Sequence, residues 1–589
     1  MLRQLCTTVC LTAALLAAGC GFQSEEPSGE TQGGTFRFLL GSEVKTLDPQ
    51  GTSWLVDFMV IRSLYEPLLR TNAETLELEP GAAEALPTVS EDGRVYTFTI
   101  REDAKWSNGD PVLASDFIYG WKRAIFADSA ADYAGLFFCI EGAEDFFTWR
   151  ADQLANFSKS GKTAEQAWDA AQKRFEETVG IKALGDRELQ ITLIDPTAYL
   201  DELTAFATFS PVHEASASKF LDVNAGSGSV TVKAEYFKDL DALVTNGPYT
   251  LTQWDFRQRL ILDQNPNYWD KASMGNTRLV IAVVIDETNR GIRYEKGEVD
   301  WYPGVPTSLP SSVDLVKSGR SDVHYSPAAG TYFYRFNCRP TIEGKPNPLA
   351  DPRVRRALSM AVDREELVNN VTRQGQPVAR TFVPPYALTD YKAPVEAGVT
   401  FDPEAGRKLL AEAGYPGGQG LTGMTILMNA GGGHENQAQA IARMWRENLG
   451  VEMQLEVIER TAFSDRIRTG GFTVGRSNWF GDYRDATTFL DMWRSNDGNN
   501  DSKYNNPRYD ELLKQAAKTV DHAERAELLR EAETILIADQ PLMPLYHVTT
   551  LQLFDPARVK GIYPNAWGAT RLDRVRVVAD EADAAAPAE

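Results

Sequence analysis

The sequence predicts an α/β protein, because strand-like and helix-like patterns alternate along most of its 589 residues. One indication is the uninterrupted apolar run from Val280 to Ile285, which is typical of a buried strand. A second is Asp351-Pro352, which supplies a cap and a first-turn proline to a helix. The apolar positions after this start recur at helical spacing: Val354, Ala357, Leu358, Ala361 and Val362.

The first half of the chain contains further strand and helix patterns. An alternating strand starts at Thr35, and a helical stretch follows through residues 62–66. A strand is predicted at Val95–Ile100, followed by a turn and by a helix that starts at Ser115-Asp116. Residues 141–178 are rich in Ala, Gln, Glu and Lys and are predicted to be helical and polar.

The second half continues in the same way. Residues 245–249 and 265–269 bound a strand pair, and a helix is predicted from Glu435 to Asn448, ending at Gly450. The alternation from Val451 to Val457 predicts a strand. Two amphipathic helices follow, with these apolar positions: Leu512, Leu513, Ala516, Leu528, Leu529, Ala532, Ile535 and Leu536.

Composition limits the classes of function. Hydrophobic residues make up 43% and charged residues 24%, as in soluble globular proteins, and the length suits about two to four domains. The net charge of −22 argues against binding to nucleic acid or to anionic lipid surfaces, both of which favour clustered Lys and Arg. The simplest interpretation of the acidic excess is solubility.

The N-terminus has the pattern of an export signal. A single positive charge precedes the apolar or small residues Leu5–Ala18. This run is shorter than a typical transmembrane helix. The run ends in Leu-Ala-Ala-Gly-Cys20, which resembles a bacterial lipobox, although Ala17 stands where Leu is preferred. We expect residues 1–19 to be removed, and a lipid on Cys20 to hold a flexible linker, residues 20–34, at a membrane. The alternative is an ordinary signal peptide that leaves a soluble protein.

Cysteine and histidine usage argues against a metal or redox site. After export and lipidation only Cys139 and Cys338 remain, and the sequence is compatible with a disulfide between them or with two buried thiols. The five histidines are scattered singly, and Cys-x-x-Cys pairs are absent from the sequence. Neither a hydrolase motif nor a phosphate-binding loop occurs. We therefore expect neither an enzyme nor a cofactor.

A set of motifs resembles one family along nearly the whole mature chain. The matching stretches, in the order of the family, are 41–49, 65–68, 106–111, 245–249, 265–269, 351–364 and 480–490. They are similar to the oligopeptide- and dipeptide-binding proteins of ABC importers, family 5 of the bacterial extracellular solute-binding proteins. The resemblance implies a monomer in the periplasm or at the cell surface that captures oligopeptides. It delivers them to permease and ATPase subunits, which are other chains.

The resemblance also implies a periplasmic-binding-protein-like two-lobed clamp with an additional third domain. Lobe I is expected to combine residues 35–72, 197–333 and 551–580. The additional domain II would comprise residues 73–196, and lobe III residues 334–550. Residues 581–589 are expected to form a disordered tail.

By the same resemblance, four residues of lobe III are candidates for binding peptide. Asp482 matches the position that binds the peptide α-amino group, with Trp479 in the pocket wall. Arg476 and His434 match positions that bind the peptide carboxylate for different peptide lengths. Each has a structural alternative: a turn cap for Asp482, a core aromatic for Trp479, an ion pair for Arg476 and a helix cap for His434.

The chain departs from the family pattern at several ligand positions. Ser53, Trp54 and Leu55 lie where the family has a strand that pairs with the peptide backbone, but Ser53 replaces an acidic side chain and Trp54 a small one. Arg460 stands where a pocket Trp is expected. These changes leave the preferred peptide length open.

Two further features concern the strand that enters lobe III. The positions of the family's disulfide are occupied by Gly330 and Phe480, so that bridge is absent. Tyr332 and Tyr334 are expected either to line the cleft or to pack in the core.

Three alternatives to an oligopeptide binder remain. One keeps the fold and binds another solute, such as a dipeptide, a metal complex or a sugar. Another is an exported hydrolase, for which the sequence has no motif. The third is a chaperone-like or adhesive surface lipoprotein.

Overall fold

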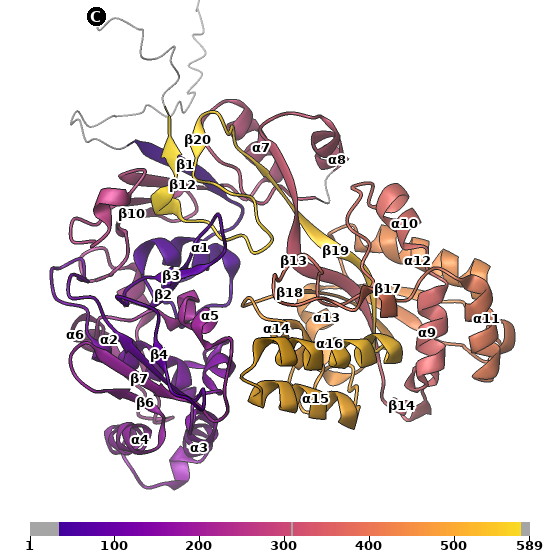
Figure 1. Ribbon diagram of the computed structural model, residues 1–589, viewed down its shortest axis with the longest axis horizontal. Coiled ribbons are helices and arrows are strands. Elements are labelled where there is room, and N and C mark those ends of the chain that lie inside the picture. Colours follow the sequence, from indigo (N-terminus) through magenta and orange to yellow (C-terminus); the bar gives the residue numbers. More distant parts are fainter. Residues whose placement is uncertain (1–33, 308–309, 579–589) are drawn as a thin grey trace, which may run out of the picture. The chain divides into compact units, whose positions relative to one another are not determined.

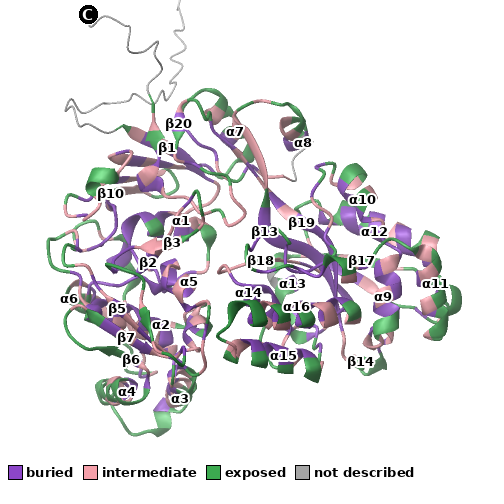
Figure 2. Ribbon diagram, viewed as in Figure 1, coloured by how far each residue is buried: buried purple, intermediate pink, exposed green. Residues whose placement is uncertain are grey.

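The computed structural model describes residues 34–307 and 310–578, which belong to one compact unit. The predicted signal peptide, Cys20 and the tail 581–589 lie outside the described residues. Strands and helices interleave throughout the described chain, and apolar side chains of the strands are largely buried while outward faces of the helices are exposed (Figures 1 and 2). This confirms the α/β class.

The first sheet joins strands from distant parts of the sequence. It has the order β1 (Thr35–Leu40), β12 (Arg278–Val283), β11 (Arg259–Gln264) and β10 (Tyr249–Asp255), with β1 parallel to β12. The prediction of a buried strand through Ile285 was wrong at its end. The strand stops at Val283, and Ile285 is 59% exposed because the chain has already left the sheet.

A second, antiparallel sheet lies in the N-terminal part of the chain. Its order is β4 (Thr88–Val89), β5 (Val95–Thr99), β7 (Glu188–Thr192) and β6 (Ile181–Ala183). The predicted polar helical stretch is confirmed as α3 (Ala143–Ala155) and α4 (Ala164–Thr178).

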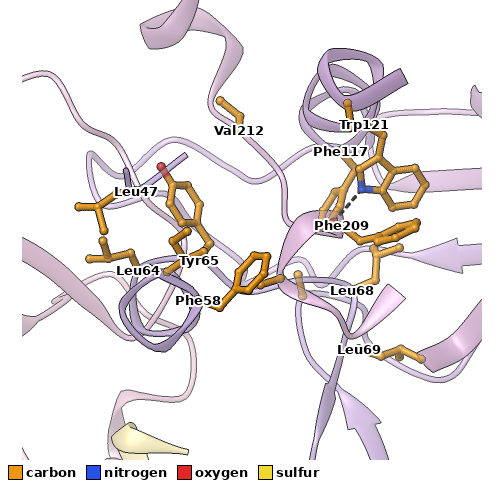
Figure 3. Packing of buried hydrophobic residues seen from close by; sticks show 14 of the residues in the cluster. Leu47, Phe58, Leu64, Tyr65, Leu68, Leu69, Phe117, Trp121, Phe209 and Val212 are labelled. Carbon is orange, nitrogen blue, oxygen red and sulfur yellow. Dashed lines mark hydrogen bonds between the residues drawn. The ribbon is translucent and has the colours of Figure 1, made fainter. Parts of the chain in front are cut away.

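One hydrophobic core connects this sheet to α1 (Leu55–Leu64) and α2 (Ala114–Ile125). Figure 3 shows Phe117 and Trp121 of α2 packed with Phe209, and the Trp121 indole N–H donates a 2.7 Å hydrogen bond to the Phe209 carbonyl. Phe58 of α1 belongs to the same cluster. The exposed residues of α1 are therefore the ones available for contacts outside this core.

The third sheet contains four of the predicted binding residues, Tyr332 and Tyr334 on one strand and Arg476 and Trp479 on its neighbour. Its order is β17 (Gln454–Ile458), β16 (Thr425–Asn429), β18 (Val474–Phe480), β13 (Val323–Phe336) and β19 (Leu542–Leu553). β16 is parallel to β17 and β18, and β13 is antiparallel to β18 and β19. The helices around it are α9 (Pro352–Met360), α11 (Pro403–Glu412), α12 (His434–Leu449), α13 (Arg460–Thr469), α15 (Pro507–Lys518) and α16 (His522–Asp539).

Local signals explain the ends of these helices. The Asp351 carboxylate accepts a 2.8 Å hydrogen bond from the Arg353 N–H, as expected of a cap at the start of α9. Helix α12 ends at Gly450, whose φ of +71° suits glycine. The strand predicted from Val451 begins only at Gln454, because the Val451 N–H bonds back to the Trp445 carbonyl and its side chain enters the core.

The remaining elements are short or peripheral. They are β2 (Leu69–Thr71), β3 (Leu78–Pro80), α5 (Leu200–Thr204), α6 (Glu214–Ala217), β8 (Leu221–Val223), β9 (Val230–Val232), α7 (Glu287–Glu295), α8 (Pro310–Lys317), β14 (Thr341–Ile342), β15 (Lys345–Pro346), α10 (Arg364–Glu366), α14 (Thr487–Leu490), β20 (Val559–Lys560) and β21 (Arg576–Val577).

The strand β18 has one partly open edge. β13 pairs with it from Val474 to Phe480, whereas β16 pairs with it only at Val474 and Gly475. From Arg476 to Phe480, the described part of the chain places no strand on the β16 side. Backbone groups on this edge are free to pair with an added strand.

The long strands β13 and β19 lie side by side (Figure 1) but change register along their length. Residues 323–327 pair with 549–553, and the register shifts before the pairing resumes at Thr331 with His547. Such a shift bends and twists a strand pair locally.

Candidate functional site

Asp482 follows the end of β18 and is held by two hydrogen bonds. Its backbone N–H donates to Thr488 Oγ1 at 2.9 Å, and the Tyr133 hydroxyl donates to its Oδ1 at 3.1 Å. Within residues 34–307 and 310–578, no Lys, Arg or His forms an ion pair with Asp482. Burial raises the pKa of Asp482 to about 6, although the Tyr133 hydrogen bond opposes this. The carboxylate is thus half-buried and uncompensated.

The turn beyond Asp482 is capped by a different acidic residue. Asp485 Oδ1 accepts the Thr487 N–H at 2.9 Å. Its carboxylate also receives two bonds from Arg525, at 2.7 and 2.8 Å, and both side chains are buried. Burial alone would raise the pKa of Asp485, but the hydrogen bonds and charge of Arg525 lower it below its usual value. The loop is therefore held in place by Asp485, which leaves Asp482 available.

Contacts to a segment near α5 also hold this loop. Arg484 Nε donates to Glu202 Oε2 at 3.0 Å, and the Tyr483 ring stacks on Tyr199 with centroids 4.7 Å apart. These residues come from positions nearly 300 apart in the sequence, and sequence patterns did not indicate that they meet.

Ser53 and Trp54 lie in the same neighbourhood. Ser53 Oγ donates to Asp132 Oδ2 at 2.7 Å, and the next residue, Tyr133, donates to Asp482. The Trp54 ring is 43% exposed and lies 3.8 Å from Lys45 Nζ. The guanidinium of Arg460 lies 5.7 Å from the same ring.

Leu55, the third residue of this segment, is 74% exposed at the start of α1. Sequence reasoning missed Asp132 and Tyr133, and no motif marks them.

Arg476 and His434 form a second cluster around Tyr332. The Tyr332 hydroxyl lies 3.0 Å from His434 Nδ1, and the Arg476 guanidinium lies 5.4 Å from the Tyr332 ring centroid. Burial, and then the charge of Arg476, lowers the pKa of His434 to about 4, so His434 is neutral near pH 7. Arg476 has no ion pair among the described residues, and its buried Nε lacks a hydrogen-bond partner there. The structural alternative of an Arg476 ion pair is not observed.

The other predicted residues pack more deeply. Tyr334 is fully buried beside Tyr332, and its register partner in β18 is Arg476. Trp479 is half-buried, and its indole N–H donates to the Thr488 carbonyl at 2.7 Å. Gly330 and Phe480 are register partners, and the Phe480 ring fills the space where a Gly330 side chain would start.

Cys139 and Cys338 are free thiols, and burial raises the pKa of both. In the part of the chain that the structure describes, no group of three or more His, Cys, Asp or Glu residues is arranged to hold a metal ion. None of the described helices is long and apolar enough to cross a membrane.

Comparison with solved structures supports the two-lobed fold. The unliganded open form of the murein tripeptide-binding protein MppA superposes with a TM-score of 0.73 at 29% identity, covering 94% of this chain and all of that chain. Haemophilus influenzae OppA in complex with RPPGFSPFR gives a TM-score of 0.70 at 26% identity, over 93% of this chain and all of that chain. The predicted periplasmic-binding-protein-like clamp is confirmed.

Sequence comparison supports the family. The chain is 33% identical to the oligopeptide-binding protein OppA of Bacillus subtilis over 94% of this chain and 96% of that protein. It is 32% identical to periplasmic OppA of Salmonella typhimurium, covering 93% of each. A probable deoxycholate-binding periplasmic protein of Escherichia coli, YgiS, is 28% identical over 94% of this chain and 95% of that protein. The model of bacterial extracellular solute-binding proteins, family 5, matches residues 77–501. This chain therefore belongs to family 5 of the bacterial extracellular solute-binding proteins, which act outside the cytoplasm.

Proposed function

We propose that this protein captures oligopeptides and delivers them to the permease of an ABC importer. One observation carries the proposal: a half-buried carboxylate without a cation, Asp482, lies at the end of a strand with an open edge. The peptide backbone adds to the β18 edge between Arg476 and Phe480, and its α-amino group binds Asp482. Backbone pairing binds the ligand independently of its side chains, and an importer of peptides of varied sequence requires such binding.

The energetics are compatible with a micromolar complex. Each backbone hydrogen bond contributes roughly 0.5–1.5 kcal/mol net, and a bond to a charged group roughly 1.5–3 kcal/mol. A micromolar dissociation constant corresponds to about −8 kcal/mol. Four or five backbone bonds together with one ionic contact at Asp482 reach this value when each contributes in the upper part of its range.

The peptide carboxylate is assigned to Arg476, with His434 as a second position. Arg476 and Phe480 are four positions apart, which is about 14 Å along a strand. An extended peptide of about four residues therefore reaches from Asp482 to Arg476. Tyr332 positions Arg476 and His434, and Tyr334 supports Tyr332 from the core.

The opposite side of the site is assigned to residues 53–55. Ser53 reaches the Asp482 region through Asp132 and Tyr133, and the Trp54 ring lies beside the Arg460 guanidinium of lobe III. Trp479 completes the wall beside the β18 edge.

We assign the closing movement of the clamp to the lobes that are expected from the sequence. In this division lobe I comprises 35–72, 197–333 and 551–580, domain II 73–196, and lobe III 334–550. Ligand bridging of lobes I and III shifts the population toward a closed form. The register of β13 against β19 shifts between residues 327 and 331 and again between residues 332 and 333, just before the boundary of lobes I and III on β13. A lipid on Cys20 holds the protein at a membrane.

A carboxylate solute without an amino group is the second candidate. The name of YgiS describes that relative as a probable deoxycholate-binding protein, and Arg476 alone satisfies such a ligand. The uncompensated Asp482 favours a zwitterionic peptide instead.

Native mass spectrometry of the protein as purified from cells, with Cys20→Ala to prevent lipidation, tests the proposal. We expect a series of adducts at peptide masses that yields sequences after release. A protein without adducts whose melting temperature is also unchanged by a peptide library contradicts the proposal. A shift with bile acids but not with peptides supports the second candidate.

Peptide affinity is expected to be highest between about pH 6 and pH 8. Asp482, whose raised pKa is about 6, must be ionised, and the peptide amino group, with a pKa near 8, must be protonated. Below pH 6 affinity should fall toward tenfold per pH unit, because the free protein must first release a proton from Asp482. Isothermal titration calorimetry from pH 4.5 to 9 measures this dependence. A flat profile between pH 5 and pH 7 would show that Asp482 does not bind the ammonium group.

A further inference from the structure

A cavity of about 320 Å³ lies beside the proposed peptide path, between β18, α13 and residues 498–501. Its charged lining residues are Arg335, Arg468, Arg476 and Asp501, so positive charge exceeds negative charge there. Asn478 lines it as well and belongs to the open part of β18. The volume lies at the lower end of the range for small-ligand sites, roughly 300–1,000 Å³.

The single acidic residue is already engaged by one arginine. Arg335 is buried, its Nη1 donates to the Asp501 carboxylate, and its Nη2 donates to Ser477 Oγ at 3.0 Å. Arg339 Nη1 donates to the Asp501 backbone carbonyl at 2.8 Å. This carboxylate therefore neutralises Arg335 and, in the described part of the chain, forms no ion pair with either of the other two arginines of the cavity.

Among the described residues, neither of those two arginines has a buried carboxylate as partner, although Arg476 is hydrogen-bonded to Tyr332. Arg476 makes no ion pair within the described ranges, and its buried Nε has no hydrogen-bond partner there. Arg468 lies 3.8 Å from Asp465, but both side chains are more than 60% exposed, so this pair contributes little. Arg476 also lowers the pKa of Arg335, although burial of Arg335 is the larger cause, which shows that like charges are crowded here. A carboxylate in the cavity relieves this crowding.

We propose that this cavity takes the carboxylate of an aspartate or glutamate side chain of the bound peptide, so that the protein prefers acidic peptides. The inference rests on the proposed function, because it assumes that the peptide follows the β18 edge past Asn478 to Arg476. In a peptide of about four residues the terminal carboxylate reaches Arg476. In a longer peptide the terminus passes it, and a side chain enters the cavity.

A preference for acidic peptides is informative because the protein itself carries a large negative charge. The net charge of −22 creates a field that disfavours anionic ligands. A preference for acidic peptides therefore cannot come from the long-range field and must come from local groups such as Arg468 and Arg476. Arginine suits this task because its planar guanidinium forms paired, charge-assisted bonds with carboxylates.

The test compares five-residue alanine peptides that carry Asp or the nearly isosteric Asn at position 2, 3 or 4. Dissociation constants are measured by titration calorimetry at pH 7 with the intact protein. At one of these positions the Asp peptide is expected to bind about tenfold more tightly than the Asn peptide, the difference typical of a charge-assisted contact. Equal affinities at every position, with penta-alanine still bound, overturn the inference and leave the proposed function standing.

A charge reversal on α13 tests whether this cavity causes the preference for acidic peptides. Arg468→Glu changes an exposed side chain, so the protein should fold normally. We expect this variant to bring the Asn-to-Asp ratio of dissociation constants to one or below. Lys408→Glu, an equal charge change on the exposed face of α11, should leave the ratio unchanged. An unchanged ratio in Arg468→Glu overturns the assignment to this cavity. If no peptide of the series binds, the proposed function and this inference fall together.

Discussion

Asp482→Asn is expected to raise the dissociation constant of a tetrapeptide with a free amino terminus by about 100-fold, or roughly 2.7 kcal/mol. The substitution removes the charge but keeps an oxygen that accepts the Tyr133 hydroxyl bond. The peptide ammonium would then be half-buried without a counterion, and a hydrogen bond between charged groups contributes roughly 1.5–3 kcal/mol. Titration calorimetry at pH 7 measures the loss.

Acetylation of the peptide provides the matched control for this variant. N-acetylated tetrapeptide lacks the ammonium group, so the original protein and Asp482→Asn should bind it with similar, weak affinity. Asp169→Asn, an exposed aspartate of α4, should bind the free peptide as the original protein does. Equal losses for free and acetylated peptides would remove the α-amino role from Asp482.

Arg525→Met is expected to destabilise the protein by about 3–5 kcal/mol at pH 7, the usual effect of removing one partner of a buried ion pair. Arg525 donates two hydrogen bonds to Asp485, and methionine leaves that carboxylate charged, buried and without its partner. Urea denaturation followed by tryptophan fluorescence measures the free energy of unfolding. Arg508→Met, which breaks an exposed pair with Glu531, is the control and should cost at most about 1 kcal/mol.

The pH dependence of this destabilisation follows from the direction of the pKa shift. Arg525 lowers the pKa of Asp485 in the folded protein, so the pair stabilises the fold above the pKa of an unfolded aspartate, about 3.9. In Arg525→Met burial raises that pKa instead, so the variant regains stability as the pH falls and Asp485 becomes protonated. The difference between the two proteins should therefore be smaller at pH 5 than at pH 7. A loss below about 1 kcal/mol at pH 7 would show that the pair is not needed to hold the loop.

Local structure followed from the sequence wherever neighbouring residues decide it. The cap at Asp351, the glycine that ends α12 at Gly450 and the polar helices between residues 141 and 178 are confirmed. Each depends on hydrogen bonds or side-chain spacing within a few residues of the chain. The errors lie at the ends of strands, at Ile285 and Val451, because packing against distant residues decides where a strand stops.

The sequence likewise predicted only part of the candidate site. Resemblance of short motifs identified Asp482, Arg476 and His434, and their binding roles remain predictions. The sequence did not indicate that Tyr133, 349 positions away, bonds to Asp482, or that Arg525 holds the same loop through Asp485.

The sequence by itself determined the α/β class, the family motifs and the type of each candidate side chain. Only the tertiary structure decided which carboxylate has a cation, which strand edge is open and which arginines share a cavity. The physical reason is that burial, pairing and pKa depend on the atoms surrounding a group. At Asp482 and Arg476 those atoms come from segments that folding brings together from distant parts of the chain.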